Sequence, residues 1–315
     1  MPQSTNTQPV GFGERLVATG QVRGRLCVGI DPHPYLLQQW GLEDTVDGLR
    51  RFSEACVEAF ADTAALVKPQ VAFYERFGSQ GFAVLEDTLQ YLREAGCLTV
   101  ADAKRGDIGS TMAGYADAWL GESSPLRADA VTVSPYLGVA ALQPVFDLAA
   151  KTGRGVFVLA ATSNPEAVQL QNFRDDSHTV AQHVVDTCAA FNGEYAESSA
   201  QDEGASQHPV GDIGVVVGAT LDTPPDLSQL NGPVLLPGVG AQGATAADVT
   251  KITQTAPQLG FPNVSRAILN AGPQVADLQK AVQETSREYF DGGLDRKSTR
   301  LNSSHVVESR MPSSA

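Results

Sequence analysis

Leu98-Thr-Val-Ala-Asp-Ala-Lys104 is an apolar, strand-like run that ends in two charged residues, Asp102 and Lys104. Residues i and i+2 of a strand point to the same face, so these two side chains are expected to project together. Arg105-Gly-Asp107-Ile-Gly-Ser-Thr111 follows directly. Asp107 and Thr111 are four residues apart and should share one face of a helical turn. The stretch therefore predicts a buried strand with charged side chains at its carboxyl end.

Strand-like runs of this kind recur along the chain and are separated by stretches with helical periodicity. Buried strands that alternate with helices predict a parallel sheet. Eight such units in about 270 residues favour a single closed (β/α)₈ barrel. An open doubly wound sheet is the alternative, but no GxGxxG follows the first strand. The expected strands are residues 26–31, 65–68, 98–104, 130–134, 155–160, 213–218, 233–236 and 266–270, and the expected helices include 50–64, 80–95, 244–259 and 274–290.

The composition of the 315 residues excludes several classes of protein. Hydrophobic residues make up 42% of the chain and charged residues 18%, which is enough for a sizeable core. With 22 basic against 36 acidic residues and no Lys/Arg run, nucleic-acid binding is not expected. No apolar run reaches the length of a membrane span, and the N-terminus has no signal-peptide pattern. We therefore expect a cytoplasmic protein without a membrane partner.

Cysteine and histidine spacing gives no sign of a metal site. The four cysteines lie far apart without CxxC, and the five histidines lack HxH or HExxH spacing. Buried, reduced thiols are the expected state of the cysteines.

Two segments depart from the repeating pattern. Residues 198–208 are small, polar and acidic, and are interpreted as an insertion before the sixth strand. Residues 295–315 have no periodicity, and 295–305 resemble the translation of a common sequencing adapter. We interpret this tail as an assembly artefact and residues 1–294 as one barrel domain.

Asp31, Lys68, Asp102 and Lys104 lie at the ends of the first three predicted strands, and Arg266 opens the predicted eighth strand. Taken singly, Asp31 can cap a turn, Lys68 can extend to solvent and Asp107 can cap a helix. Together they are buried charges that must be paired or functional. A lysine between carboxylates stays protonated and can donate a proton to a basic carbon. A carboxylate held against a substrate anion favours loss of that anion as CO₂.

A glycine-rich segment after the seventh strand predicts a phosphate site. Pro237-Gly-Val-Gly-Ala-Gln242-Gly243 lets backbone N–H groups approach an oxyanion closely, although a plain flexible loop is the alternative. Loops after strands seven and eight hold phosphate in many barrels, and Arg266 can clamp it with two hydrogen bonds.

These motifs together resemble the orotidine 5′-phosphate decarboxylases in their longer bacterial form, type 2. The matching segments are GIDPHP, VKPQVAFYERFG, ADAKRGDIGST, TSNP, LLPGVGAQG and SRAILNAG, which span roughly residues 26–272. The DxKxxD element alone is typical of a wider superfamily, whereas the combination is specific. The resemblance implies decarboxylation of orotidine 5′-phosphate to uridine 5′-phosphate, the last step of de novo UMP synthesis, without metal or organic cofactor.

The resemblance also implies roles for individual residues. Lys104 would protonate C6 after CO₂ leaves, and Asp102 would lie beside the substrate carboxylate. Asp107 would reach into the neighbouring subunit's site, so a homodimer with shared sites is expected. The implied substrate-binding residues are Asp31 and Lys68 for the ribose, Thr111 across the subunit boundary, Ser163 for the pyrimidine, and Gln242 and Arg266 for the phosphate.

Two other functions remain open at this point. Mg²⁺-dependent sugar-phosphate decarboxylases and synthases share DxKxxD but place a carboxylate after strand two, where this chain has Lys68, a cation that repels a divalent ion. A non-catalytic nucleotide-binding barrel is the second alternative, and it would be expected to lack part of the charged set.

Overall fold

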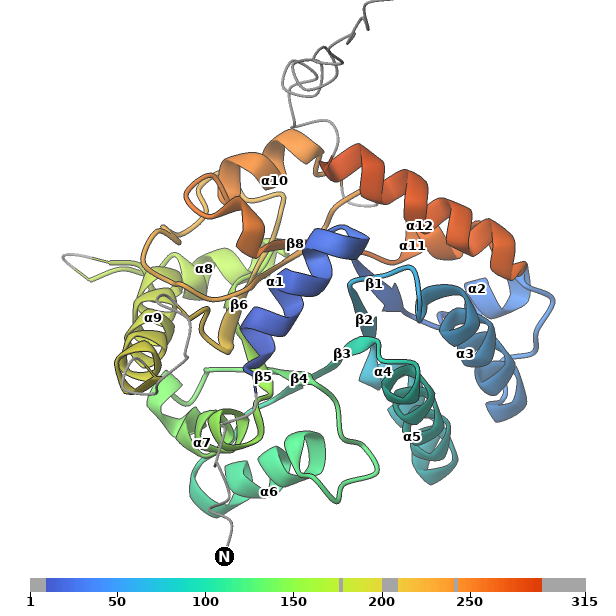
Figure 1. The fold of residues 1–315 in the computed structure, drawn as a ribbon, viewed down its shortest axis with the longest axis horizontal. Coiled ribbons are helices and arrows are strands. Elements are labelled where there is room, and N and C mark those ends of the chain that lie inside the picture. The colour runs from blue at the N-terminus through green and yellow to red at the C-terminus, as the bar shows by residue number, and fades with distance from the viewer. Residues whose placement is uncertain (1–9, 176–177, 200–208, 241–242, 291–315) are drawn as a thin grey trace, which may run out of the picture.

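The computed structural model describes residues 10–175, 178–199, 209–240 and 243–290. Eight parallel strands form one closed barrel in sequence order, and β1 pairs with β8 to complete it (Figure 1). This confirms the predicted (β/α)₈ fold. The strands are β1 Cys27–Ile30, β2 Leu66–Pro69, β3 Leu98–Arg105, β4 Ala130–Val133, β5 Gly155–Ala161, β6 Ile213–Val217, β7 Val234–Pro237 and β8 Gly260–Val264.

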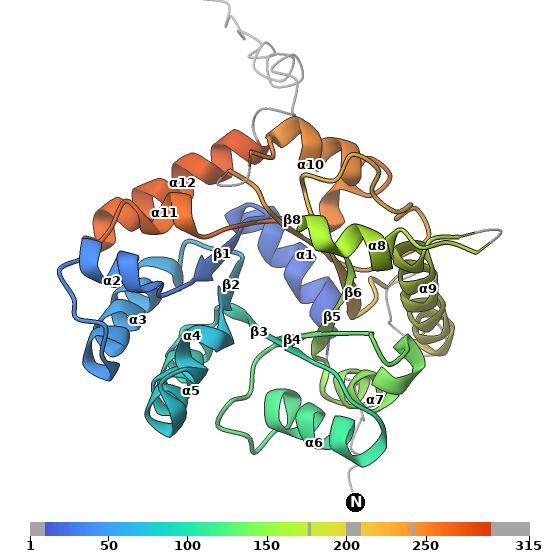
Figure 2. The ribbon, with the colours of Figure 1, turned by 180° about the vertical axis from the view of Figure 1, so that it is seen from behind.

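Helices surround the barrel and bury an apolar layer against it (Figures 1 and 2). The expected helices at 50–64, 80–95 and 274–290 correspond to α3, α5 and α12; α3 begins earlier because Thr45 accepts a hydrogen bond from the Gly48 N–H. The larger helices are α3 Val46–Phe60, α5 Gly78–Glu94, α6 Gly109–Leu120, α7 Gln143–Thr152, α9 Val180–Ser199, α10 Ala246–Ile252 and α12 Val275–Phe290. The shorter ones are α2 Pro34–Gln39, α4 Val71–Glu75, α8 Val168–Gln171, α11 Arg266–Leu269 and the 3₁₀ turns Val139–Leu142, Pro165–Ala167 and Pro257–Leu259.

The eighth strand lies elsewhere than predicted. The sequence pattern placed it at residues 266–270, but β8 is Gly260–Val264 and Arg266 begins the short helix α11. Pro262 and Asn263 make residues 260–264 look unlike a strand in the sequence, because proline is rare in strands that pair on both sides. The correction matters for function, since Arg266 follows β8 and therefore lies at the carboxyl end of the barrel.

An unpredicted helix, α1 (Phe12–Arg23), closes the amino end of the barrel (Figure 1). Phe12 and Leu16 are fully buried in a cluster with residues from the strand starts, among them Leu66 and Leu98. The Phe12 ring meets the Phe157 ring edge-on, with centroids 5.9 Å apart. This cluster fills the barrel interior below the site.

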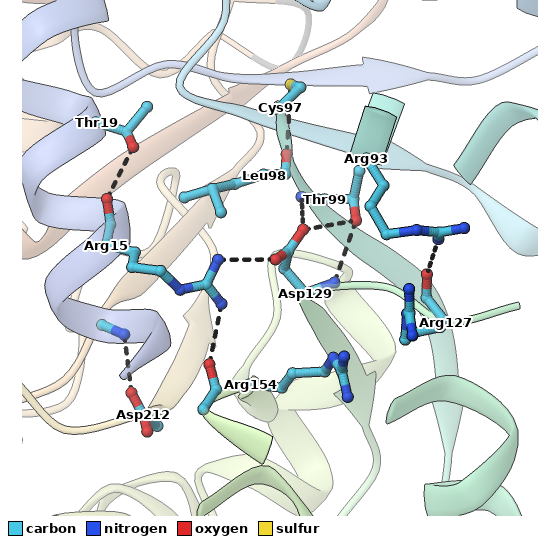
Figure 3. A network of polar contacts seen from close by, with 12 residues as sticks. Arg15, Thr19, Arg93, Cys97, Leu98, Thr99, Arg127, Asp129, Arg154 and Asp212 are labelled. Atoms are coloured by element: carbon cyan, nitrogen blue, oxygen red, sulfur yellow. Dashed lines mark hydrogen bonds and ion pairs between the residues drawn. The ribbon is translucent and has the colours of Figure 1, made fainter. Parts of the chain in front are cut away.

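Polar contacts attach α1 to the strand starts (Figure 3). The Arg15 guanidinium donates to Asp129 Oδ1 and to the Gly153 carbonyl, each at 2.9 Å. Asp129 Oδ2 in turn accepts the Thr99 N–H at 3.0 Å. The charges at this end are therefore bound largely to backbone groups.

Asp212, just before β6, caps the first turn of α1. Its Oδ1 accepts the Gly13 N–H at 2.9 Å, while its Oδ2 is buried without a hydrogen-bond partner among the described residues. Burial raises the pKa of Asp212 to about 6, against the lowering effect of the Gly13 N–H. The buried, ionised Asp212 carboxylate therefore lowers the stability of the folded protein at neutral pH.

Two sequence predictions fall largely outside the described residues. Of the insertion at 198–208, only the last residues of α9 are described, and the tail at 295–315 is outside the described ranges altogether.

The expected helix at 244–259 is divided into α10 and the Pro257–Leu259 turn. Within the described residues, no helix is both long and apolar enough to cross a membrane.

Candidate active site

Four charged side chains alternate in sign across the carboxyl ends of the first three strands. Lys68 Nζ, at the end of β2, lies 3.0 Å from Asp102 Oδ2 and 3.8 Å from Asp31 Oδ1. Lys104 Nζ lies 2.6 Å from Asp102 Oδ1. Asp102 and Lys104 project together, as the strand spacing predicted. We call Asp31, Lys68, Asp102 and Lys104 the charge array.

The inner members of the charge array are ionised despite their burial. Lys68 is 4% and Asp102 8% exposed. Burial acts to lower the pKa of Lys68, but Asp102 and Asp31 outweigh it and raise the pKa above its ordinary value. Burial acts to raise the pKa of Asp102, but Lys68 and Lys104 hold it well below its usual range. Asp102 therefore keeps its negative charge throughout the neutral range.

Lys104 is presented by an irregular stretch of β3. Its φ is 49°, a left-handed conformation that is uncommon for lysine, and the β3–β4 register shifts between Ala101 and Arg105. The Lys104 N–H donates to Thr132 Oγ1 at 2.9 Å. The side chain remains 45% exposed, in contrast to buried Lys68. Lys104 is thus the cation of the array that faces open space.

Two neutral residues that the sequence analysis missed complete the surroundings of Asp102. Gln70 Nε2 donates to Oδ2 at 2.8 Å, and Thr132 Oγ1 donates to Oδ1 at 2.9 Å. Asp102 therefore accepts two hydrogen bonds on each oxygen, which fixes the carboxylate plane. The available signal was position: Gln70 is two residues beyond Lys68, and Thr132 is the polar residue of an apolar strand.

A cavity of about 270 Å³ opens beside the charge array. The array and Gln70 form one wall, and apolar side chains of β5, β6 and β7 form the opposite part of the lining. Arg266 and the start of the glycine-rich loop complete the rim. The cavity is lined by Asp31, Lys68, Gln70, Asp102, Lys104, Thr132, Leu159, Thr162, Val216, Leu235, Pro237, Gly238, Val239, Asn263, Ser265 and Arg266.

The structure brings together five of the nine predicted site residues: the charge array and Arg266. Asp107 and Thr111 do not line this cavity; Asp107 Oδ1 accepts the Ile108 N–H at 2.8 Å, and Thr111 is exposed on the first turn of α6. Ser163 follows Thr162 of the lining and packs against Gly218, where an added Cβ would lie 3.1 Å from Ser163 Cβ. Gln242 lies outside the described residues.

Metal ligands do not cluster at this site. Among the residues that the structure describes, no group of three or more His, Cys, Asp or Glu side chains is arranged to hold a metal ion. The two carboxylates of the array are each paired with Lys68. The arrangement places the buried Asp102 carboxylate beside the partly exposed Lys104 side chain at the wall of one cavity.

The sequence matches the orotidine 5′-phosphate decarboxylase / HUMPS family over residues 24–281. The chain belongs to this family. It is 61% identical to the orotidine 5′-phosphate decarboxylase of Corynebacterium glutamicum (strain R) over 279 residues, covering 88% of this chain and 97% of the relative. It is 54% identical to the enzyme of the same name from Salinispora arenicola, covering 86% and 94%.

Solved structures of family members share the fold. A crystal structure from Streptomyces avermitilis matches with a TM-score of 0.81 and 48% identity, covering 92% of this chain and 98% of that one. The OMP decarboxylase of Leishmania donovani matches with a TM-score of 0.68 and 29% identity, covering 89% and 98%. The orotidine 5′-phosphate decarboxylase family thus accounts for the barrel and for the motifs at its carboxyl end.

Proposed function

We propose that the cavity binds orotidine 5′-phosphate and that the charge array drives its decarboxylation to uridine 5′-phosphate and CO₂, the last step of UMP synthesis. The observation that carries this proposal is the alternation Asp31–Lys68–Asp102–Lys104 at one wall of a cavity whose rim holds Arg266. Membership of the orotidine 5′-phosphate decarboxylase family and 54–61% identity to the two named relatives support it.

The reaction divides between Asp102 and Lys104. Asp102, held anionic by two lysines, repels the substrate carboxylate at C6 and raises the energy of the bound acid. The C6–carboxyl bond breaks, CO₂ leaves and the electron pair stays on C6. Lys104 then gives its ammonium proton to C6 and becomes a neutral amine, which regains a proton from solvent. Its exposed position next to Asp102 suits this role.

The remaining predicted residues position the substrate. Asp31 and Lys68 would hold the ribose hydroxyls, and Ser163 would read the pyrimidine. Arg266 and Gln242 would bind the phosphate together with backbone N–H groups of the glycine-rich loop. Gly238 and Gly240 support this assignment, because their φ values of 96° and 71° belong to a conformation that glycine adopts without strain.

The active enzyme would be a homodimer with shared sites. Asp107 and Thr111 are absent from the lining of their own barrel's cavity, which fits a role across a subunit boundary. Ile108, Tyr136 and Leu137 are large apolar residues that stand exposed in the connections after β3 and β4. Exposed apolar groups at the end of two adjacent strands are typical of an interaction surface.

The enzyme unit would comprise residues 1–294, with residues 295–315 foreign to it. A cytoplasmic location is part of the same proposal. It is supported by the four cysteines, which are all free and buried, as expected in a reducing compartment.

An absorbance assay with purified protein and orotidine 5′-phosphate tests this function. We expect conversion to uridine 5′-phosphate at the same rate with and without EDTA. Activity abolished by EDTA and restored by Mg²⁺ would contradict the proposal and favour a metal-dependent sugar-phosphate enzyme. Binding of the nucleotide without turnover would favour a non-catalytic barrel.

A further inference from the structure

Gln171 ties the connection after β5 back to the end of that strand. Its helix, α8 (Val168–Gln171), lies next to α9 (Figure 2). Gln171 is the only residue between Val168 and Arg174 that is not exposed. Apolar Leu170 and Phe173 remain largely in solvent. An apolar core therefore does not hold this segment in place.

Gln171 makes two hydrogen bonds to Thr162, the first residue after β5. Its Oε1 accepts the Thr162 N–H at 2.7 Å, and its Nε2 donates to Thr162 Oγ1 at 2.9 Å. The Thr162 hydroxyl donates its own proton to Asn164 Oδ1 at 2.7 Å. The Thr162 hydroxyl therefore acts as an acceptor toward Gln171. The Gln171 side-chain amide has both an acceptor for the Thr162 N–H and a donor for the Thr162 hydroxyl.

Thr162 lies between two cavities. It lines the cavity beside the charge array, and with Gln171 it also lines a second cavity of about 660 Å³ beneath α8. This second space separates α8 from the connection at residues 220–225. Few atoms pack against Thr162 on the side of the second cavity. The two hydrogen bonds from Gln171 therefore help to fix the position of Thr162.

Ser163 directly follows Thr162 in the chain. On its far side it packs against Gly218, where an added Cβ would lie 2.9 Å from Ser163 N, and the Gly218 N–H donates to the Ala161 carbonyl at 2.8 Å. The Thr162–Ser163 pair is thus held between the end of β6 and Gln171.

We propose that Gln171 is a positioning residue for nucleobase recognition: by fixing Thr162, it places Ser163 against the pyrimidine. This inference rests on the proposed function, because it takes Ser163 as the residue that reads the base. Gln171 does not itself line the cavity beside the charge array.

The test compares ligands with and without the base. Dissociation constants for uridine 5′-phosphate and ribose 5-phosphate are measured on the wild type, Gln171→Ala, Gln171→Glu and the control Gln169→Ala, which removes an exposed amide of the same helix. We expect Gln171→Ala to weaken uridine 5′-phosphate binding about tenfold, as two hydrogen bonds are lost, with ribose 5-phosphate binding within about twofold. Gln171→Glu keeps an acceptor for the Thr162 N–H and should fall between.

Thr162→Val provides an independent second variant, because it removes the hydroxyl but keeps the N–H that Gln171 accepts; we expect an intermediate loss confined to the base-containing ligand. Equal weakening of both ligands, or unchanged uridine 5′-phosphate binding by Gln171→Ala, would overturn the inference. Failure of the wild type to bind uridine 5′-phosphate would instead contradict the proposed function, so the two failures are distinguishable.

Discussion

The two ends of the barrel both carry partly or fully buried charged side chains, but the charges are neutralised differently. At the amino end, Arg15 and Asp129 bind each other and also backbone groups of neighbouring elements. At the carboxyl end, Lys68, Asp102 and Lys104 bind mainly one another, beside a cavity. Charges bound to backbone stabilise a structure, whereas charges held against one another beside open space are available to a ligand.

The contrast explains why one fold needs both arrangements. The amino end must be closed by α1, whose Phe12 fills the barrel interior, so its polar groups are used to attach that helix. The carboxyl end leaves Lys104 accessible beside the cavity, and four donors immobilise its partner Asp102. We therefore expect substitutions at the carboxyl end to change catalysis and substitutions at the amino end to change stability.

Arg266→Ala should give a large catalytic effect without a matching loss of stability. Removal of a charge-assisted clamp should cost about 2–4 kcal/mol in kcat/KM for orotidine 5′-phosphate. Part of the loss should appear in kcat, because phosphate binding also positions the reacting end. Steady-state kinetics on orotidine 5′-phosphate and on orotidine, which lacks the phosphate, provide the measurement.

The orotidine measurement serves as the internal control. With orotidine as substrate, the kcat/KM of Arg266→Ala should equal that of the wild type. The kcat/KM of Arg287→Ala, which removes an exposed arginine of α12, should also equal it. An equal loss on both substrates would show that Arg266 acts on folding or on the ring and not on the phosphate.

Mixing two inactive variants tests whether the carboxyl end is completed by a second subunit. Lys104→Ala and Asp107→Ala homodimers should each be nearly inactive. Random exchange makes about half of the dimers mixed, each with one intact site of two, so activity should recover to about a quarter of wild type. Mass-labelled subunits verify exchange, and no recovery after verified exchange would place Asp107 in its own chain's site.

Asp212→Asn should give the smallest effect, and it should be confined to stability. The folded pKa of about 6 exceeds the ordinary aspartate value, so protonated Asp212 stabilises the fold at low pH. This contribution is present below about pH 4 and is lost as the pH rises through about 6. The variant lacks this titration but keeps an acceptor for the Gly13 N–H.

The stability gain of Asp212→Asn over the wild type should therefore be about 1 kcal/mol larger at pH 7.5 than at pH 5.0. Thermal unfolding at both pH values measures it, with exposed Asp62→Asn as the control. A gain that does not change with pH would mean that Asp212 does not titrate in this window. The kcat for orotidine 5′-phosphate should remain that of the wild type.

The barrel was predictable because its strands and helices follow one another in regular order, yet two elements were not. β8 contains Pro262 and Asn263, which normally break strands; Asn263 is accommodated because its side chain donates to the Cys27 carbonyl. α1 is rich in glycine, which lowers helix propensity. Gly13 is needed there, since an added Cβ would lie 2.3 Å from the Gly211 carbonyl oxygen. Both β8 and α1 form because of contacts with residues far away in the sequence. Such contacts cannot be recognised from the local sequence pattern.

The charge array was predictable because charge at the end of an apolar strand is conspicuous. Gln70 and Thr132 were missed because neutral polar residues are common in strands and turns, and only the folded chain shows that both donate to Asp102. Asp107 and Thr111 were implied by family resemblance, and both lie outside the lining of the cavity in their own chain. The roles of all site residues remain predictions.

The central claim is that the carboxyl end performs the chemistry, with Lys104 as the proton donor. The most direct test measures kcat for orotidine 5′-phosphate and Tm in Lys104→Ala, beside Arg15→Ala from the amino end. We predict that Lys104→Ala loses about 10²–10⁴-fold in kcat, the range for a general acid, and keeps a Tm near wild type. Arg15→Ala should lower Tm and keep kcat. A Lys104→Ala protein that turns over within about tenfold of wild type would contradict the account, because it would fall outside that range.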